Sequence, residues 1–161
     1  MQILLLWSCT LSLAAQAEAA PASHITREHH QAVLEEQITK GVIDQPLTAS
    51  EVLGGKASVA MLHRTQPETS ALVHDRVTET YYILSGTGTL VTGGALRDAK
   101  PTDLSRVNAG MSRTGAREGG EGRKLKPGDI VVIPAGTPHS FSELDGPIEY
   151  LVYRFEPTTK R

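Results

Sequence analysis

The sequence has few cross-linking residues and no excess of either charge. Its 161 residues include a single cysteine, Cys9, so no disulfide can form within the chain. The formal net charge is −2, which argues against a protein that binds nucleic acid through bulk electrostatics. Neither a GxGxxG nor a Walker pattern occurs, so the sequence gives nucleotide binding no support.

The chain also lacks an apolar run long enough to cross a bilayer. Residues 3–15 are almost wholly apolar, whereas a transmembrane helix needs about 20 such residues. The run is typical of a signal peptide, and A-x-A cleavage sites follow at residues 15–17 and 17–19. A lipoprotein signal at Cys9 and a buried N-terminal helix are the alternatives. We expect a signal peptide over residues 1–19, a secreted or periplasmic protein, and no membrane attachment after cleavage.

What remains is enough for one domain built from short strands. Fifteen glycines and nine prolines break the chain often, which favours strands and turns over a helical bundle. A helix is predicted over residues 23–40, with Ser23 as its N-cap and Gly41 as its stop. The polar, Gly-rich residues 95–126 are expected to form a long surface connection. Strands are expected over residues 58–63, 79–84, 89–91, 130–133 and 148–155, in an all-β barrel or sandwich.

Two short segments carry residues suited to metal binding. The first begins at His74 and enters a predicted strand at Glu79, and the second ends at His139. Imidazole and carboxylate ligands together suit Fe(II), Mn(II), Zn(II) and Ni(II). A Pro- and Gly-containing turn over residues 134–138 would hold His139 in place. Little conformational entropy would then be lost when a metal ion binds. His74, Glu79 and His139 are therefore candidate ligands of one divalent metal ion of unknown identity.

These segments resemble the two motifs of the cupin superfamily. The matching residues are His74, Glu79 and Gly86 for the second half of the first motif, and Gly128, Pro134, Gly136 and His139 for the second. The wider pattern is similar to bacterial single-domain cupins with a secretion signal. The resemblance covers roughly residues 56–156 and implies a jelly-roll barrel, the double-stranded β-helix. It places a cupin barrel over residues 51–157, preceded by a helical arm over residues 20–50.

The sequence departs from the cupin pattern at three positions. Leu72 stands where the first motif has its first histidine, Gln66 where it has its leading glycine, and Glu143 where the second motif ends in asparagine. Two histidines and one carboxylate remain, the set used by facial-triad iron sites, which leave coordination positions open. The alternative is a barrel that binds a small organic ligand without metal, and Leu72 keeps that alternative open.

Two further side chains are candidates for catalysis. His63 shares strand parity with Val59 and Met61, so it is expected to point inward as an extra ligand or acid–base group, or to be an ordinary rim histidine. Tyr81 shares the parity of Glu79 and is either a proton donor or ordinary aromatic packing. Arg76 either faces the cavity and holds an anion or is solvated.

The resemblance implies a divalent-metal-binding cupin that is an enzyme acting on a small oxygenated organic compound. Dioxygenase, isomerase and decarboxylase chemistry are all compatible with it. The alternative is a non-catalytic cupin that binds a small molecule or a metal, because this architecture hosts both. No nucleic-acid partner is expected. The apolar face of the strand at residues 148–155 is compatible with a homodimer.

Overall fold

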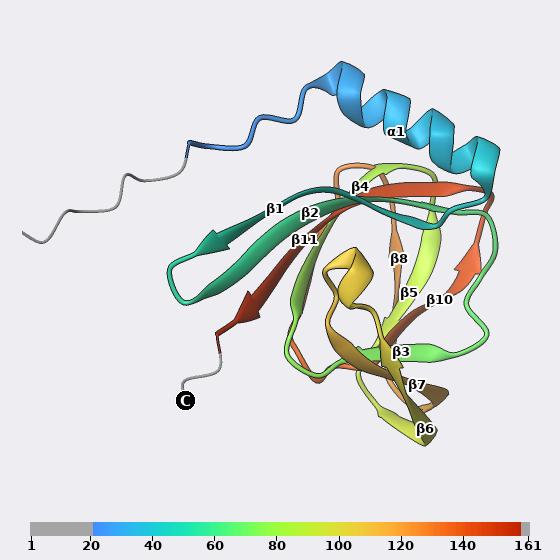
Figure 1. Ribbon diagram of the computed structural model, residues 1–161. Helices are drawn as coiled ribbons and strands as arrows, with labels where there is room; N and C mark the ends of the chain where they lie inside the picture. The colour runs from blue at the N-terminus through green and yellow to red at the C-terminus, as the bar shows by residue number, and fades with distance from the viewer. Residues whose placement is uncertain (1–20, 159–161) are drawn as a thin grey trace, which may run out of the picture.

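The computed structural model describes residues 21–158, so the signal peptide predicted for residues 1–19 lies outside the described residues. Within that range, one helix precedes eleven strands in two antiparallel sheets (Figure 1). The five-stranded sheet has the order β1-β2-β11-β4-β9, with β1 at Asp44–Val52, β2 at Gly55–Arg64, β4 at Thr78–Ser85, β9 at Ile130–Ile133 and β11 at Ile148–Pro157. No helix between residues 21 and 158 is both long and apolar enough to cross a membrane.

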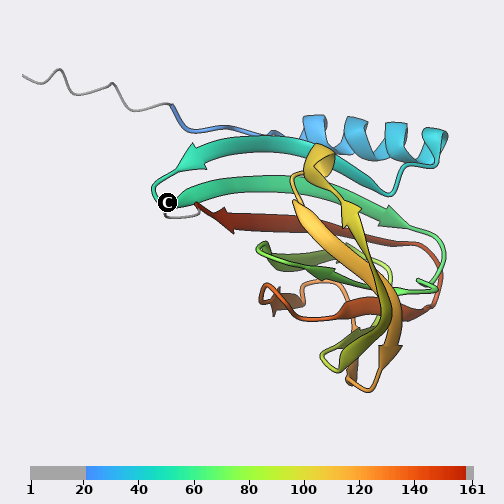
Figure 2. The ribbon, with the colours of Figure 1, turned by 60° about the horizontal axis from the view of Figure 1, so that its bottom comes forward.

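The second sheet has six strands in the order β6-β7-β3-β10-β5-β8. Its strands are β3 (Ala71–His74), β5 (Gly88–Thr92), β6 (Ala95–Asp103), β7 (Met111–Glu118), β8 (Glu121–Leu125) and β10 (His139–Leu144). A short 3-10 helix, η1 (Ser105–Val107), connects β6 to β7. Figure 2 shows the long strands β1, β2 and β11 forming a layer above the smaller strands of this second sheet.

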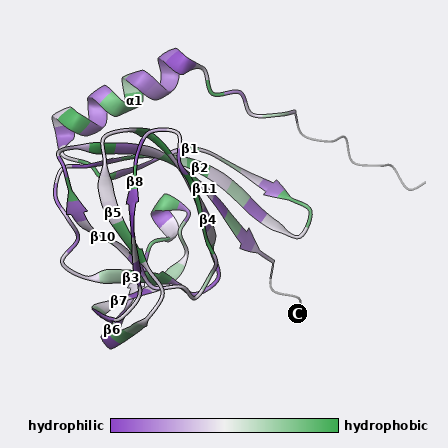
Figure 3. Cartoon of the chain, turned by 180° about the vertical axis from the view of Figure 1, so that it is seen from behind, coloured by the Kyte–Doolittle hydropathy of each residue, from purple (hydrophilic) through white to green (hydrophobic). Residues whose placement is uncertain are grey.

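The apolar core lies between the two sheets, where Figure 3 shows hydrophobic segments of several strands. Alternate residues of each strand face inward, as the two-residue period of a strand requires. The core cluster comprises Ala60, Leu62, Tyr81, Ile83, Leu90, Leu125, Ile133, Phe141, Ile148, Tyr150 and Val152. This jelly-roll barrel confirms the predicted all-β fold class with a short N-terminal helix.

The five strands predicted from sequence lie within β2, β4, β5, β9 and β11. The surface connection predicted for residues 95–126 is wrong, because this stretch forms β6, β7 and β8. Most residues of β6 and β8 are exposed, and no side chain of β6 is fully buried. Strands that are solvated on both faces show no apolar alternation, so their sequence reads as a loop.

Helix α1 (Arg27–Lys40) begins four residues later than predicted. Thr26, not Ser23, is the N-cap, and its hydroxyl accepts a hydrogen bond from the His29 backbone at 3.2 Å. Gly41 ends the helix in the left-handed conformation, as predicted. The boundary expected between a helical arm and the barrel, at residues 50 and 51, falls inside β1, which pairs with β2.

One polar side chain docks α1 on the barrel. Gln37 is the single fully buried residue of α1, and its side-chain amide donates to the carbonyl groups of Ile43 (3.1 Å) and Met61 (3.0 Å). Figure 3 shows polar and apolar residues mixed along this helix. The helix therefore attaches through a specific hydrogen-bonded anchor rather than through a broad apolar face.

Candidate metal centre

Three side chains predicted as ligands meet inside the barrel. His74 ends β3, His139 opens β10, and Glu79 is the second residue of β4, so both sheets contribute. All three are buried, and one ligand atom from each lies within 4.8 Å of the others. The His74 Nε2 atom is 3.3 Å from Glu79 Oε1, and the His139 Nε2 atom is 3.4 Å from Glu79 Oε2.

The turn before β10 fixes the position of His139. The Gly136 backbone N–H donates to the carbonyl of His74 at 2.8 Å, which ties the turn to the end of β3. Gly136 has a φ of 81°, a conformation that glycine adopts without strain. In the sheet, His139 is the register partner of Leu72. Local turn chemistry thus brings two motifs that are distant in sequence into one site.

The outer nitrogen of each imidazole has a partner that fixes its tautomer. The Nδ1 atom of His139 is 3.0 Å from the carbonyl oxygen of Thr137, which can only accept, so this nitrogen carries the hydrogen. The Nδ1 atom of His74 is 2.8 Å from the Ser112 hydroxyl oxygen. That hydroxyl donates in turn to the carbonyl of Ala109 (3.2 Å) or Gly110 (3.3 Å). When either ring is neutral, its Nε2 atom therefore carries the lone pair.

These two Nε2 atoms are suited to bind a cation. Both are buried and have no hydrogen-bond partner in the described part of the chain. Each Nε2 atom faces an oxygen of Glu79. In a neutral ring, the nitrogen lone pair and the oxygen lone pair repel one another unless a cation lies between the two atoms. A metal ion, or a proton on the ring, removes that repulsion. Two imidazole nitrogens and one carboxylate fit a divalent transition metal or zinc.

Glu79 is ionised in this site. Burial raises the pKa of its carboxyl group, but hydrogen bonds from His139 and His74, when their Nε2 atoms carry a proton, and the charge of Arg154 outweigh burial and hold the pKa well below its usual range. Burial alone would lower the pKa of His139, but the Glu79 carboxylate raises it above its ordinary value. The cluster is therefore arranged around a negative charge that attracts cations.

Comparison with known proteins gives similarity in structure only. No family model matches the sequence, and neither does any curated protein. A crystal structure from Bacillus halodurans superposes with a TM-score of 0.51 over 88% of this chain and 86% of that one, at 14% identity. KdgF from Halomonas sp. gives 0.43 over 72% and 79% of the two chains, at 16% identity, and a cupin protein from Bacteroides fragilis gives 0.39 over 66% and 70%, at 20% identity.

The topology decides the fold: two antiparallel sheets enclose a core, and the two motif segments meet inside it. The chain has the cupin fold. Gly86, at the end of the first motif, has a structural reason to be glycine in this barrel. Its φ is 75°, and a side-chain Cβ would lie 2.1 Å from the carbonyl oxygen of Pro147.

Tyr81 lines the candidate metal site of this cupin barrel, as its parity predicted. Its hydroxyl donates to Glu79 Oε2 at 3.0 Å, and its ring lies edge-on to His139 with centroids 6.3 Å apart. Burial and the neighbouring Glu79 charge raise the pKa of Tyr81 well above its ordinary value, so the hydroxyl keeps its proton. The ring also packs on Tyr150, with centroids 4.8 Å apart. Tyr81 is thus both a core aromatic and a hydrogen-bond donor to the site.

His63 does not point inward as predicted. Ala60 and Leu62 are the core residues of β2, so His63 lies on the opposite, outer face of the sheet. Its Nδ1 atom is 3.6 Å from Glu149 Oε1, and it takes no part in the cation cluster. The parity was misread because α1 contacts β2 there, and Met61 on the outer face is buried as well.

The structure places two arginines whose positions the sequence did not settle. Arg76 donates a hydrogen bond to the carbonyl of Pro157, at the C-terminal end of β11. Arg154 was not predicted, yet it is buried, and its Nε atom donates to Glu79 Oε1 at 2.8 Å. The signal was present in β11, because Ile148, Tyr150 and Val152 alternate toward the core and Arg154 continues that face.

A cavity of about 420 Å³ opens beside the cluster. It is lined by Gly41, Val42, Ile43, Asp44, Arg64, Leu72, Leu104, Arg106 and Val107. Asp44 and the carbonyl of Val107 both accept hydrogen bonds from Arg154, and Leu72 pairs with His139. We call this the mouth cavity; it is lined by neighbours of the cluster and not by His74, Glu79 or His139 themselves.

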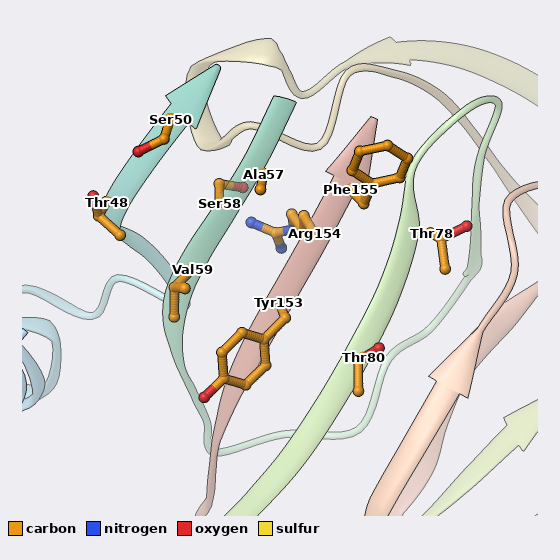
Figure 4. A pocket seen from close by; sticks show the side chains of 10 residues that line it. All are labelled: Thr48, Ser50, Ala57, Ser58, Val59, Thr78, Thr80, Tyr153, Arg154 and Phe155. Carbon is orange, nitrogen blue, oxygen red and sulfur yellow. The ribbon is translucent and has the colours of Figure 1, made fainter. Parts of the chain in front are cut away.

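A second hollow lies over β1, β2, β11 and β4 (Figure 4). Its lining contains no histidine or carboxylate, so it is unsuited to a metal ion. Tyr153 and Phe155 on this outer face are 47% and 41% exposed. This is the apolar face that the sequence marked as compatible with a homodimer, and that assembly stays a prediction.

Proposed function

We propose that this cupin barrel binds one divalent metal ion through His74, His139 and Glu79 and acts on a small oxygenated organic compound. The observation that supports it most strongly is the pair of buried Nε2 atoms without partners, aimed at an ionised carboxylate. Two imidazoles and one carboxylate leave coordination positions for water or substrate. A bound divalent ion would supply Lewis-acid polarisation of a substrate oxygen.

The mouth cavity provides space for a small molecule next to residues that contact the cluster. Its volume of about 420 Å³ suits a compound of that class. Leu72, Leu104 and Val107 provide apolar walls, and Asp44 provides a carboxylate. Within the site, Tyr81 holds a proton on its hydroxyl at Glu79 and keeps that carboxylate oriented. The alternative is a cupin that binds a small molecule without catalysis. It is favoured by Leu72, whose apolar side chain lies beside His139 in place of a metal ligand.

Removing either imidazole is expected to abolish tight metal binding. Loss of a group that merely supports a ligand weakens metal affinity about 10–100-fold, so His74→Ala and His139→Ala should each weaken Zn²⁺ binding at least about 100-fold. Elemental analysis and competition with a chromophoric chelator measure this. His63→Ala removes a buried histidine on the outer face and should leave affinity unchanged. Equal metal content in all four proteins would contradict the ligand assignment.

Restoring a histidine at residue 72 is expected to strengthen the site. Leu72 has the same inward parity as His74 and is the register partner of His139. Leu72→His would add a fourth ligand, as closed zinc sites have, and tighten Zn²⁺ binding by about tenfold. Leu104→His, at another wall of the mouth cavity, serves as the control. If the two variants bind Zn²⁺ equally, residue 72 does not face the ion.

A further inference from the structure

Arg154 donates hydrogen bonds to three residues beside the candidate metal site. It lies opposite Glu79 in the pairing of β11 with β4 and is 5% exposed. Its Nε atom donates to Glu79 Oε1 at 2.8 Å, and its Nη2 atom donates to Asp44 Oδ2 at 2.6 Å. Its Nη1 atom donates to the carbonyl of Val107 at 2.7 Å. All three guanidinium nitrogens are engaged, so the side chain is fixed in place.

This arrangement puts one positive charge between two negative ones. Glu79 belongs to the cation cluster, while Asp44 lies outside it and lines the mouth cavity. A divalent ion held by Glu79 would share that carboxylate with the guanidinium, so two cations would face one anion. Charges inside a protein interact more strongly than in water, and salt screens them little. The Arg154 charge therefore opposes metal binding, and the Asp44 charge offsets part of that opposition.

We propose that Arg154 competes with the divalent ion for the Glu79 carboxylate and keeps the affinity of the site low, with Asp44 setting the strength of that competition. Arg154 is then a positioning residue that acts through Glu79. The inference rests on the proposed metal-binding function. It agrees with Leu72, which supplies no fourth ligand at the same site. The Arg154 charge and the missing fourth ligand both favour a metal ion that dissociates and rebinds readily over one that stays bound.

The test compares Co²⁺ affinity at about pH 8, where carboxyl groups are normally ionised. Binding is measured by chelator competition for the full chain and for Arg154→Met, Arg154→Lys and Asp44→Asn. Arg154→Met should bind Co²⁺ at least about tenfold more tightly, and Asp44→Asn at least about threefold more weakly. Arg154→Lys keeps the charge and should stay within about threefold of the unchanged protein.

Arg64→Met is the matched control. Arg64 is another mostly buried arginine, and it donates to the Tyr150 hydroxyl at 2.8 Å and pairs with Glu68 at 3.0 Å, without a contact to Glu79. Its loss should leave Co²⁺ affinity unchanged. The opposite signs for Arg154→Met and Asp44→Asn are the decisive readout, because a residue that only supported the fold would lose Co²⁺ in both variants.

Each result decides the proposal. Weaker or unchanged Co²⁺ binding in Arg154→Met overturns it, and so does unchanged or tighter binding in Asp44→Asn. If circular dichroism shows that Arg154→Met does not fold, Asp44→Asn decides alone. Co²⁺ binding that appears only in Arg154→Met would support the competition and overturn the proposed function. Absence of binding in every variant would overturn both.

Discussion

Glu79→Gln is expected to destabilise the protein by about 3 kcal/mol in the presence of a metal chelator, because the buried Arg154 charge loses one of its two carboxylate partners. For a chain of this size, the loss corresponds to a fall in the melting temperature of roughly 6–12 °C. The chelator ensures that the measured change reports the ion pair and not a bound ion. Thermal unfolding followed by circular dichroism measures it.

A carboxylate at the surface provides the control for Glu79. Glu118 pairs with Arg97 at 3.2 Å, but both side chains are more than half exposed, at 57% and 64%. Exposed ion pairs contribute little, so Glu118→Gln should change stability by less than about 1 kcal/mol. If Glu79→Gln melts at the same temperature as Glu118→Gln, the buried pair makes no special contribution to the fold.

Phe141→Ala is expected to cost about 3–5 kcal/mol, the typical loss for deleting a buried aromatic ring. Phe141 is 1% exposed, its ring is stacked with Tyr81 at 6.4 Å, and it packs on Tyr150 at 5.5 Å. Its removal leaves a void between the two sheets, behind the candidate metal site. Urea denaturation should show a lower midpoint with a similar dependence on denaturant.

The same substitution on the outer face tests this argument. Phe155 is 41% exposed on β11, so Phe155→Ala should cost about 1 kcal/mol or less. A loss equal to that of Phe141→Ala would contradict the exposed position of this ring. It would show that the outer face is covered in solution.

The parts of the fold that the sequence predicted are those in which one face of a strand is buried. In β4 and β11 the residues alternate between core and exterior, and that alternation is visible without a structure. Strands β6 and β8 gave no signal because they are mostly exposed. In β2 the opposite condition hides the orientation of His63, since four consecutive residues are buried there.

The candidate ligands were predictable because their geometry is largely local. A Pro- and Gly-containing turn aims His139, and Glu79 follows His74 within one short segment. Arg154 was missed for two physical reasons. Arginine is rarely buried unless it is paired, and its partner Glu79 is 75 positions away in the sequence. Only the pairing of β11 with β4 brings the two together.

The donors of this site come from both layers of the barrel, with two on one sheet and one on the other. An ion bound there would cross-link the two sheets, because separating them would first require its release. The single cysteine of the sequence cannot form a disulfide within the chain, so no covalent cross-link would do the same. Saturating the site with a metal ion should slow the opening of the barrel.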